Sequence, residues 1–230
     1  MSRKPVKKSV QRKPIILLAD SQLLFDDSFN RRYLDVQCSS FGENKVKAAF
    51  IGVSGDDNPL FFRIFEAFIS RRRAHSYRQI SRRFSEQERA FLSEADLIVL
   101  GGGDPIAGWK ILQQSGMAEV VIKRYYEGAL LIGVSAGAIQ LGIAVKEEST
   151  MFSLVPMLID VHNEENEWSS LRNSLLKNTS YITGLGIPKG GGMLYHPDQT
   201  VEAVARPLHE FRKREHRVIE HLIMPEESKL

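Results

Sequence analysis

The sequence has only one cysteine and no long apolar run, and these two features limit the classes of protein to which it can belong. Cys38 has no second cysteine with which to form an internal disulfide, which is typical of proteins from a reducing compartment. No segment approaches the roughly 20 apolar residues that a membrane span needs. A secretory signal is not expected either, because the apolar stretch Ile15–Ala19 after the basic residues 1–13 is short and ends at Asp20. We therefore expect a cytoplasmic protein with no membrane segment.

The chain also lacks a strong excess of charge of one sign. Its 31 Lys and Arg against 28 Asp and Glu give a net charge of +3, and the excess comes largely from residues 1–13, which we expect to form a disordered basic tail. No nucleic-acid-binding module is recognisable in the sequence, so a nucleic-acid partner is not expected. No cluster of His, Cys and carboxylates has metal-ligand spacing, so neither a metal nor an organic cofactor is implied.

Apolar strands and helical patterns alternate along residues 14–230, which we interpret as one α/β domain. This alternation is typical of a mostly parallel sheet covered by helices on both faces, a three-layer sandwich. Strands are expected at Ile15–Ala19, Ala48–Val53, Ser76–Ile80, Asp96–Leu100, Leu130–Val134 and Tyr181–Leu185. Helices are expected after the caps Asn58 and Ser85, over Pro105–Gln114 and Met117–Tyr126, from Ala136 to about Val145, and over Glu164–Leu176. Near the end, Gly191–His196 and Thr200–Ala205 predict a hairpin, and the last 25 residues are expected to be mostly helical or frayed.

The segment that carries the chemistry is a G-x-S-x-G turn between a strand and a helix. Gly133, Ser135 and Gly137 form this turn, directly after the strand Leu130–Val134. A serine in that position lies on a tight, strained turn with its hydroxyl exposed at the carboxyl end of the sheet, as nucleophilic serines do. The backbone N–H of Ala136 would then point to a developing oxyanion. The alternative is a strand-to-helix connection that is merely rich in small residues.

A run of three glycines follows the neighbouring strand. Gly101, Gly102, Gly103 and Asp104 come after Asp96–Leu100, without the lysine and spacing of a P-loop. Loops at the carboxyl ends of adjacent parallel strands face the same crevice. The N–H of Gly102 or Gly103 is therefore predicted as the second oxyanion donor, and Asp104 as a substrate contact. The alternative for any one glycine is a structural turn.

These two segments together, LGGGDP and GALLIGVSAGAIQLG, resemble the serine peptidases that include aspartyl dipeptidase (peptidase E) and cyanophycinase. The resemblance runs from about Ile15 to Ala205. It implies the fold shared with class I glutamine amidotransferases, and a serine, here Ser135, that attacks an amide carbonyl of a small peptide or isopeptide. It also implies His162 as the base, at the end of a segment that closes in D-x-H, and makes Asp160 a candidate for the substrate pocket.

The residues alone leave the base open, because His162, His196 and His209 all follow Ser135. His162 is favoured because it closes an apolar run and should lie at the end of a strand. The same strand would place Asp160 on the same side of the extended chain.

Two departures from the family pattern affect catalysis and specificity. Pro188-Lys189 stands where the family has an orienting acid, and loss of such an acid can cost about 10⁴ in kcat. The acidic segment after His162, with Glu165 at its centre, stands where relatives have arginines. If Glu165 lines the pocket, the pocket favours a cationic substrate over an aspartyl one. The alternative is that Glu164, Glu165 and Glu167 form a solvated first helical turn.

Three other functions remain open at this point. The first is a catalytically impaired relative that serves as a binding module, which the missing acid motivates. The second is an α/β-hydrolase esterase with Asp160 and His196 as its acid and base. The third is a nucleic-acid binder that uses the basic tail. A homodimer is compatible with any of these interpretations.

Overall fold

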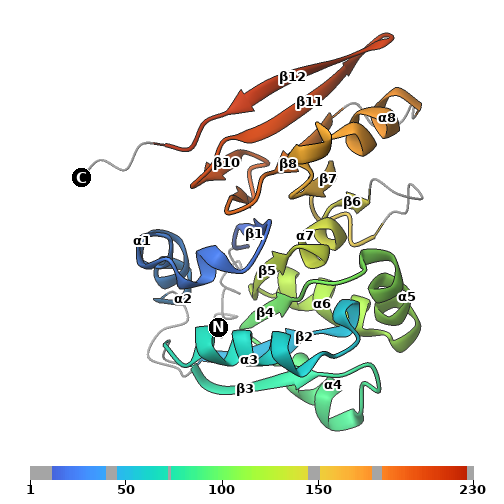
Figure 1. The fold of residues 1–230 in the computed structure, drawn as a ribbon. Coiled ribbons are helices and arrows are strands. Elements are labelled where there is room, and N and C mark those ends of the chain that lie inside the picture. The colour runs from blue at the N-terminus through green and yellow to red at the C-terminus, as the bar shows by residue number, and fades with distance from the viewer. Residues whose placement is uncertain (1–11, 40–45, 72–73, 145–150, 178–182, 227–230) are drawn as a thin grey trace, which may run out of the picture.

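The computed structural model describes residues 12–39, 46–71, 74–144, 151–177 and 183–226. Its centre is a seven-stranded sheet (Figure 1), in the order β10 (Val201–Val204), β9 (Gly192–Tyr195), β1 (Ile15–Leu18), β5 (Leu130–Val134), β4 (Leu97–Leu100), β2 (Val46–Ile51) and β3 (Ala74–Ile80). The five adjacent strands β1, β5, β4, β2 and β3 are parallel to one another. The strands β9 and β10 are antiparallel to their neighbours. The mostly parallel sheet that the sequence predicts is therefore confirmed.

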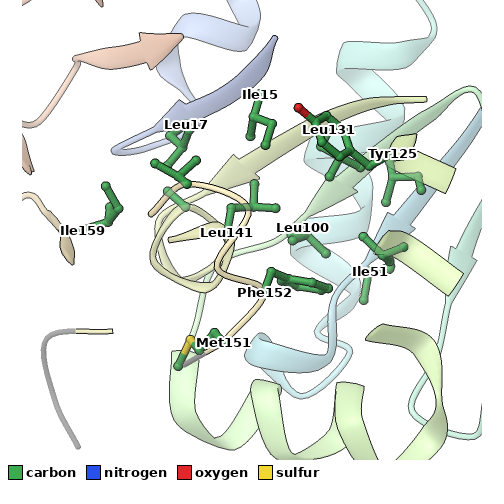
Figure 2. Packing of buried hydrophobic residues seen from close by; sticks show 14 of the residues in the cluster. Ile15, Leu17, Ile51, Leu100, Tyr125, Leu131, Leu141, Met151, Phe152 and Ile159 are labelled. Atoms are coloured by element: carbon green, nitrogen blue, oxygen red, sulfur yellow. The ribbon is translucent and has the colours of Figure 1, made fainter. Parts of the chain in front are cut away.

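Both faces of this sheet are covered, because successive side chains of a strand point to opposite faces. In β1, Ile15 and Leu17 join one core cluster and Ile16 and Leu18 join the other. The first cluster, part of which is drawn in Figure 2, packs against α4 (Glu86–Leu92), α5 (Pro105–Ser115), α6 (Met117–Tyr126) and α7 (Ala136–Leu141). The second packs against η1 (Gln22–Phe25), α1 (Asp27–Phe29), η2 (Asn30–Leu34) and α3 (Pro59–Ile69), while α2 (Asp35–Ser39) follows η2 directly. The architecture is the three-layer sandwich expected.

A second sheet lies above the first in Figure 1 and was not expected from the sequence. Its order is β12 (Arg217–Ile223), β11 (Leu208–Arg214), β8 (Thr183–Ile187), β7 (Leu158–Val161) and β6 (Ile143–Ala144). A third cluster of buried side chains fixes α8 (Ser169–Lys177) against this sheet through Trp168, Leu171, Leu175 and Phe211. Because β7 belongs to this second sheet, the residues that follow β7 are positioned by the second sheet and not by the first.

Several local predictions are confirmed by the hydrogen bonds that begin each helix. The Asn58 side chain accepts from the Leu60 N–H ahead of Pro59, and Ser85 with Glu88 forms a complete capping box. β9 and β10 form the predicted hairpin. The residues that form each of these features lie close together in the sequence, so local sequence alone encodes each feature.

Two predictions about secondary structure are wrong, one about where a helix ends and one about the type of element near the C-terminus. The helix after Ser135 ends at Leu141 rather than near Val145, because Gly142 leaves the helical conformation (φ −93°, ψ −143°) and the Ile143 N–H donates to Met157 O at 3.0 Å. Over residues 208–223 the chain forms the β11–β12 hairpin rather than a helix or a frayed end, while residues 227–230 lie outside the described ranges. Its spaced apolar residues Leu208 and Phe211 imitate a helical pattern, but the backbone of β11 pairs with β8 on one side and with β12 on the other.

No helix in the described ranges is long and apolar enough to cross a membrane. Residues 1–11 of the predicted basic tail lie outside the described ranges, as do residues 178–182, where the expected strand Tyr181–Leu185 begins. From Thr183 onward that strand is present as β8.

Candidate active site

Ser135 lies at the carboxyl end of β5 on a strained turn. Its backbone adopts φ 52° and ψ −112°, a region that non-glycine residues rarely enter, and its N–H donates to Leu18 O at 2.9 Å. A Cβ at Gly133 would lie 2.5 Å from Gly137 O, and one at Gly137 would lie 2.3 Å from Leu100 O. The strand and helix therefore approach each other closely, as the G-x-S-x-G pattern predicts.

The glycine loop at the end of β4 lies beside this turn. A Cβ at Gly102 would lie 3.4 Å from Ser135 Cβ, which is ordinary van der Waals contact. Gly103 adopts φ 131°, and a Cβ there would lie 2.0 Å from Ser54 O, so only glycine fits. Within the described part of the chain, the N–H groups of Gly102, Gly103 and Ala136 donate no hydrogen bond. Three backbone donors are thus available near the serine hydroxyl.

His162 reaches the same serine from the second sheet. It follows β7 directly, with φ 42°, and its backbone N–H donates to Ile187 O of β8 at 2.9 Å. Its Nε2 lies 3.0 Å from Ser135 Oγ. The other ring nitrogen, Nδ1, has no hydrogen-bond partner among the described residues. The pair has the spacing of a nucleophile and its base.

The other two histidines are engaged elsewhere. His196 Nε2 lies 3.1 Å from Glu202 Oε2, and His209 Nδ1 lies 2.7 Å from Glu220 Oε1. Neither histidine lines the cavity that contains Ser135 and His162.

That cavity is a cleft of about 920 Å³ between the glycine loop with the start of α5, the serine turn and the end of β7. Ser135, Ala136 and His162 line it together with Gly103. The cleft is therefore large enough for a small peptide, and it brings the Ser135 hydroxyl, the His162 ring and backbone donors to one place.

A family model supplies the identification. The model of peptidase family S51 matches residues 39–191, which is well over half of the chain and includes Gly101–Gly103, Ser135 and His162. The chain belongs to peptidase family S51. No protein among the curated ones matches it significantly.

Two solved structures share the fold of this S51 peptidase. One is a peptidase from an acI-B1 Actinobacterium, 14% identical, with a TM-score of 0.75 over 96% of this chain and 97% of that one. The other is a candidate peptidase E from Listeria monocytogenes EGD-e, also 14% identical, with a TM-score of 0.58 over 84% of this chain and 98% of that one. At these identities the similarity concerns the fold.

The three predicted substrate contacts of the S51 peptidase differ in position. Asp104 and Asp160 line the cleft. Asp104 Oδ1 also accepts from the Ile106 and Ala107 N–H groups as the cap of α5, and the two Asp160 oxygens accept from Val161 N and Asn163 Nδ2. Glu165 is exposed and is not among the residues that line the cleft, so the geometry gives the acidic-pocket expectation no support.

Sequence reasoning missed four polar residues of the cleft, which are Lys110, Asn163, Asn166 and Ser170. Lys110 lies on α5 and is exposed. Helical spacing from Asp104 through Ala107 to Lys110 could have indicated that these positions share one face. Asn166 donates to Asn163 Oδ1, and Asn163 donates to Asp160 Oδ2; no short motif signals such a network.

The serine turn depends on the absence of a side chain at Gly137. We expect Gly137→Ala to destabilise the S51 peptidase by about 1–3 kcal/mol, because the new methyl group must displace Leu100 O. That change lowers Tm by roughly 2–4 °C per kcal/mol for a chain of this size. Thermal unfolding measures it, with Gly102→Ala as the matched control whose methyl group finds space. Equal Tm values for the two variants would contradict the close approach.

Proposed function

We propose that this S51 peptidase hydrolyses a peptide or isopeptide bond through an acyl-enzyme formed on Ser135, with His162 as the base. The observation that carries the proposal is the 3.0 Å contact between Ser135 Oγ and His162 Nε2 on a strained strand-to-helix turn. Such strain persists where the surrounding structure holds a functional group in place.

The free backbone donors complete the proposed chemistry. Ser135 Oγ bonds to the amide carbon while its proton passes to His162 Nε2. The carbonyl oxygen becomes negatively charged and accepts from Ala136 N–H and from Gly102 or Gly103 N–H, which have no other partners among the described residues. The C–N bond then breaks as His162 returns the proton to the leaving amine. Water, activated by the same imidazole, cleaves the ester and regenerates Ser135.

The cleft supports a short, polar substrate. Asp104 and Asp160 offer carboxylates, and Lys110 offers a cation that can pair with a carboxylate of the substrate. Since Glu165 lies outside the cleft, a general preference for cationic substrates is not part of this proposal. The cytoplasmic location and the homodimer stay predictions.

The competing interpretations differ in their support. An esterase that uses His196 would need that ring near Ser135, whereas it pairs with Glu202. Catalytic impairment has one observation in its favour, because His162 Nδ1 lacks an orienting partner among the described residues. Turnover decides between impairment and activity.

The test is a screen of dipeptides, short peptides and β-aspartyl isopeptides, followed by detection of the released amines. Activity on any of them supports the proposal, whereas p-nitrophenyl esters cleaved without any amide would favour an esterase. Binding of peptides without turnover would favour the impaired binding module.

A further inference from the structure

A second cavity, of about 250 Å³, also reaches Ser135. It shares Ser135 and Gly103 with the cleft but none of the cleft's other lining residues, and His162 lines the cleft only. A carbonyl held at Ser135 by the glycine loop would therefore lie at the junction of the two spaces. One substituent of the scissile bond can enter the cleft while another enters this cavity.

The walls of the second cavity are apolar and held in place by packing. They come from four segments far apart in the chain and include Leu24, Phe50, Phe61, Ile64, Phe65 and Val99. The Phe50 and Phe65 rings stack with centroids 5.3 Å apart. The Phe50 ring also packs against the glycine loop, where a Cβ at Gly101 would lie 2.8 Å from Phe50 Cζ.

Among the described residues that line this cavity, Asp20 is the single charged side chain, and both of its oxygens are engaged. Oδ1 accepts from Gln22 N at 2.9 Å and Oδ2 accepts from Gly190 N at 2.7 Å. A carboxylate that entered would lose its water, meet no cation and face a negative charge. An apolar side chain instead gains by leaving water.

We propose that this cavity is a substrate subsite for a large apolar side chain, of leucine or phenylalanine size, on a residue that flanks the scissile bond. The proposal rests on Ser135 as the nucleophile and names the substrate class of the same site. Aspartyl side chains are excluded from this cavity, although the polar cleft can still take the other half of the substrate.

Binding to Ser135→Ala tests the subsite without turnover. The probes are Ala-Ala dipeptides in which each position in turn is replaced by Phe, Asp or Lys, titrated by calorimetry. We expect Phe at one position to bind at least about 10-fold tighter than Asp or Lys there, as the contrast between apolar and charged side chains in an apolar pocket implies. Tighter binding of Asp or Lys at both positions, or no binding of any peptide, would overturn the proposal.

A matched pair on α3 assigns the preference to the cavity. Ile64 and Leu60 are both partly exposed apolar residues of this helix, but only Ile64 lines the cavity. In the Ser135→Ala background, Ile64→Gln should remove most of the Phe preference and Leu60→Gln should leave it unchanged. Equal effects of the two changes would contradict the subsite. If the Phe preference is present but the wild type hydrolyses no peptide, the subsite stands and the proposed acyl-enzyme mechanism is contradicted.

A separate observation concerns the orientation of His162. For Nε2 to accept the serine proton, the neutral ring must carry its hydrogen on Nδ1, and that N–H has no partner among the described residues. Glu164 follows two residues later. Its Oε1 accepts from Lys189 N at 3.0 Å, while Oε2 is buried and has no partner in the described part of the chain. A buried carboxylate oxygen without a donor is costly.

His162 and Glu164 are both tied to the end of β8, the first through Ile187 O and the second through Lys189 N. A donor and an acceptor that both lack partners among the described residues thus lie two residues apart, and each is anchored to the segment 187–189. We infer that Glu164 is the positioning residue of His162 and accepts its Nδ1–H when substrate fills the cleft, since catalytic hydrogen bonds often tighten only in the complex.

Glu164→Gln tests this role, because the amide oxygen of Gln can still accept from Lys189 N while the charge is lost. We expect kcat to fall about 10²- to 10⁴-fold with KM and Tm nearly unchanged, and Glu86→Gln, an exposed change on α4, to have no effect. The downfield NMR resonance of a bonded Nδ1–H should be present in the wild type with a boronic acid inhibitor and absent from Glu164→Gln. Wild-type kcat in Glu164→Gln, or a resonance lost only in Asp160→Asn, would overturn the assignment.

Discussion

Ser135→Ala is expected to lower kcat for peptide hydrolysis by about 10⁶-fold, the loss that follows removal of a serine nucleophile acting together with its base. The fold should be retained, because the hydroxyl faces the cleft and its removal creates no cavity in the core. Purified variant and wild type should be compared by amine release and by thermal unfolding. Ser93→Ala, an exposed serine after α4, is the control.

Turnover that persists at the wild-type rate in a clean Ser135→Ala preparation would show that another group performs the reaction. An unfolded variant would not settle the matter, so equal Tm values are required before the rates are compared. Ser135→Cys adds a second check, since a thiol in the same place should give altered kcat rather than unfolding.

The second large effect is expected at His162. We expect His162→Ala to lower kcat/KM by about 10⁴-fold or more at pH 7–8, because Ser135 then has no base. His196→Ala and His209→Ala should change it little, since their rings pair with Glu202 and Glu220 outside the cleft. The three variants assayed side by side decide the base. A larger loss at His196 than at His162 would contradict the proposed pair.

The parts of the site that the sequence predicts well are encoded locally. Gly133, Ser135 and Gly137 lie within five residues. A Cβ at Gly133 would meet Gly137 O and one at Gly137 would meet Leu100 O of β4, so both flanking positions require glycine. The glycine loop follows the neighbouring strand, and the parallel order of β4 and β5 brings both loops to one edge. Such features need no knowledge of distant contacts.

The features that the sequence does not predict depend on long-range pairing. The β11–β12 hairpin turns at Glu215-His216, which lacks the Asn-Gly or Asp-Gly signature of a tight turn, although Glu215 adopts φ 55°. β8 pairs with β7 on one side and with β11 on the other, and no local pattern specifies either partner. The second sheet that carries His162 therefore emerges only from the folded chain.

The same reason explains why the sequence reveals neither the environment of the acidic segment nor the apolar cavity. Glu164 and Glu165 are neighbours, yet one is anchored to Lys189 N and the other is exposed, because the turn after β7 directs them differently. The apolar cavity combines Leu24, Phe50, Phe61 and Val99, whose successive members are separated by 11 to 38 positions in the sequence. In the sequence these residues are indistinguishable from ordinary core positions.

The most direct test of Ser135 as the nucleophile is its labelling by a fluorophosphonate probe, followed by intact-mass measurement and peptide mapping. We expect one adduct per chain, located on Ser135, and labelling that is strongly slowed in His162→Ala. An adduct on a different residue, or no adduct in a preparation that hydrolyses peptides, would contradict the acyl-enzyme mechanism.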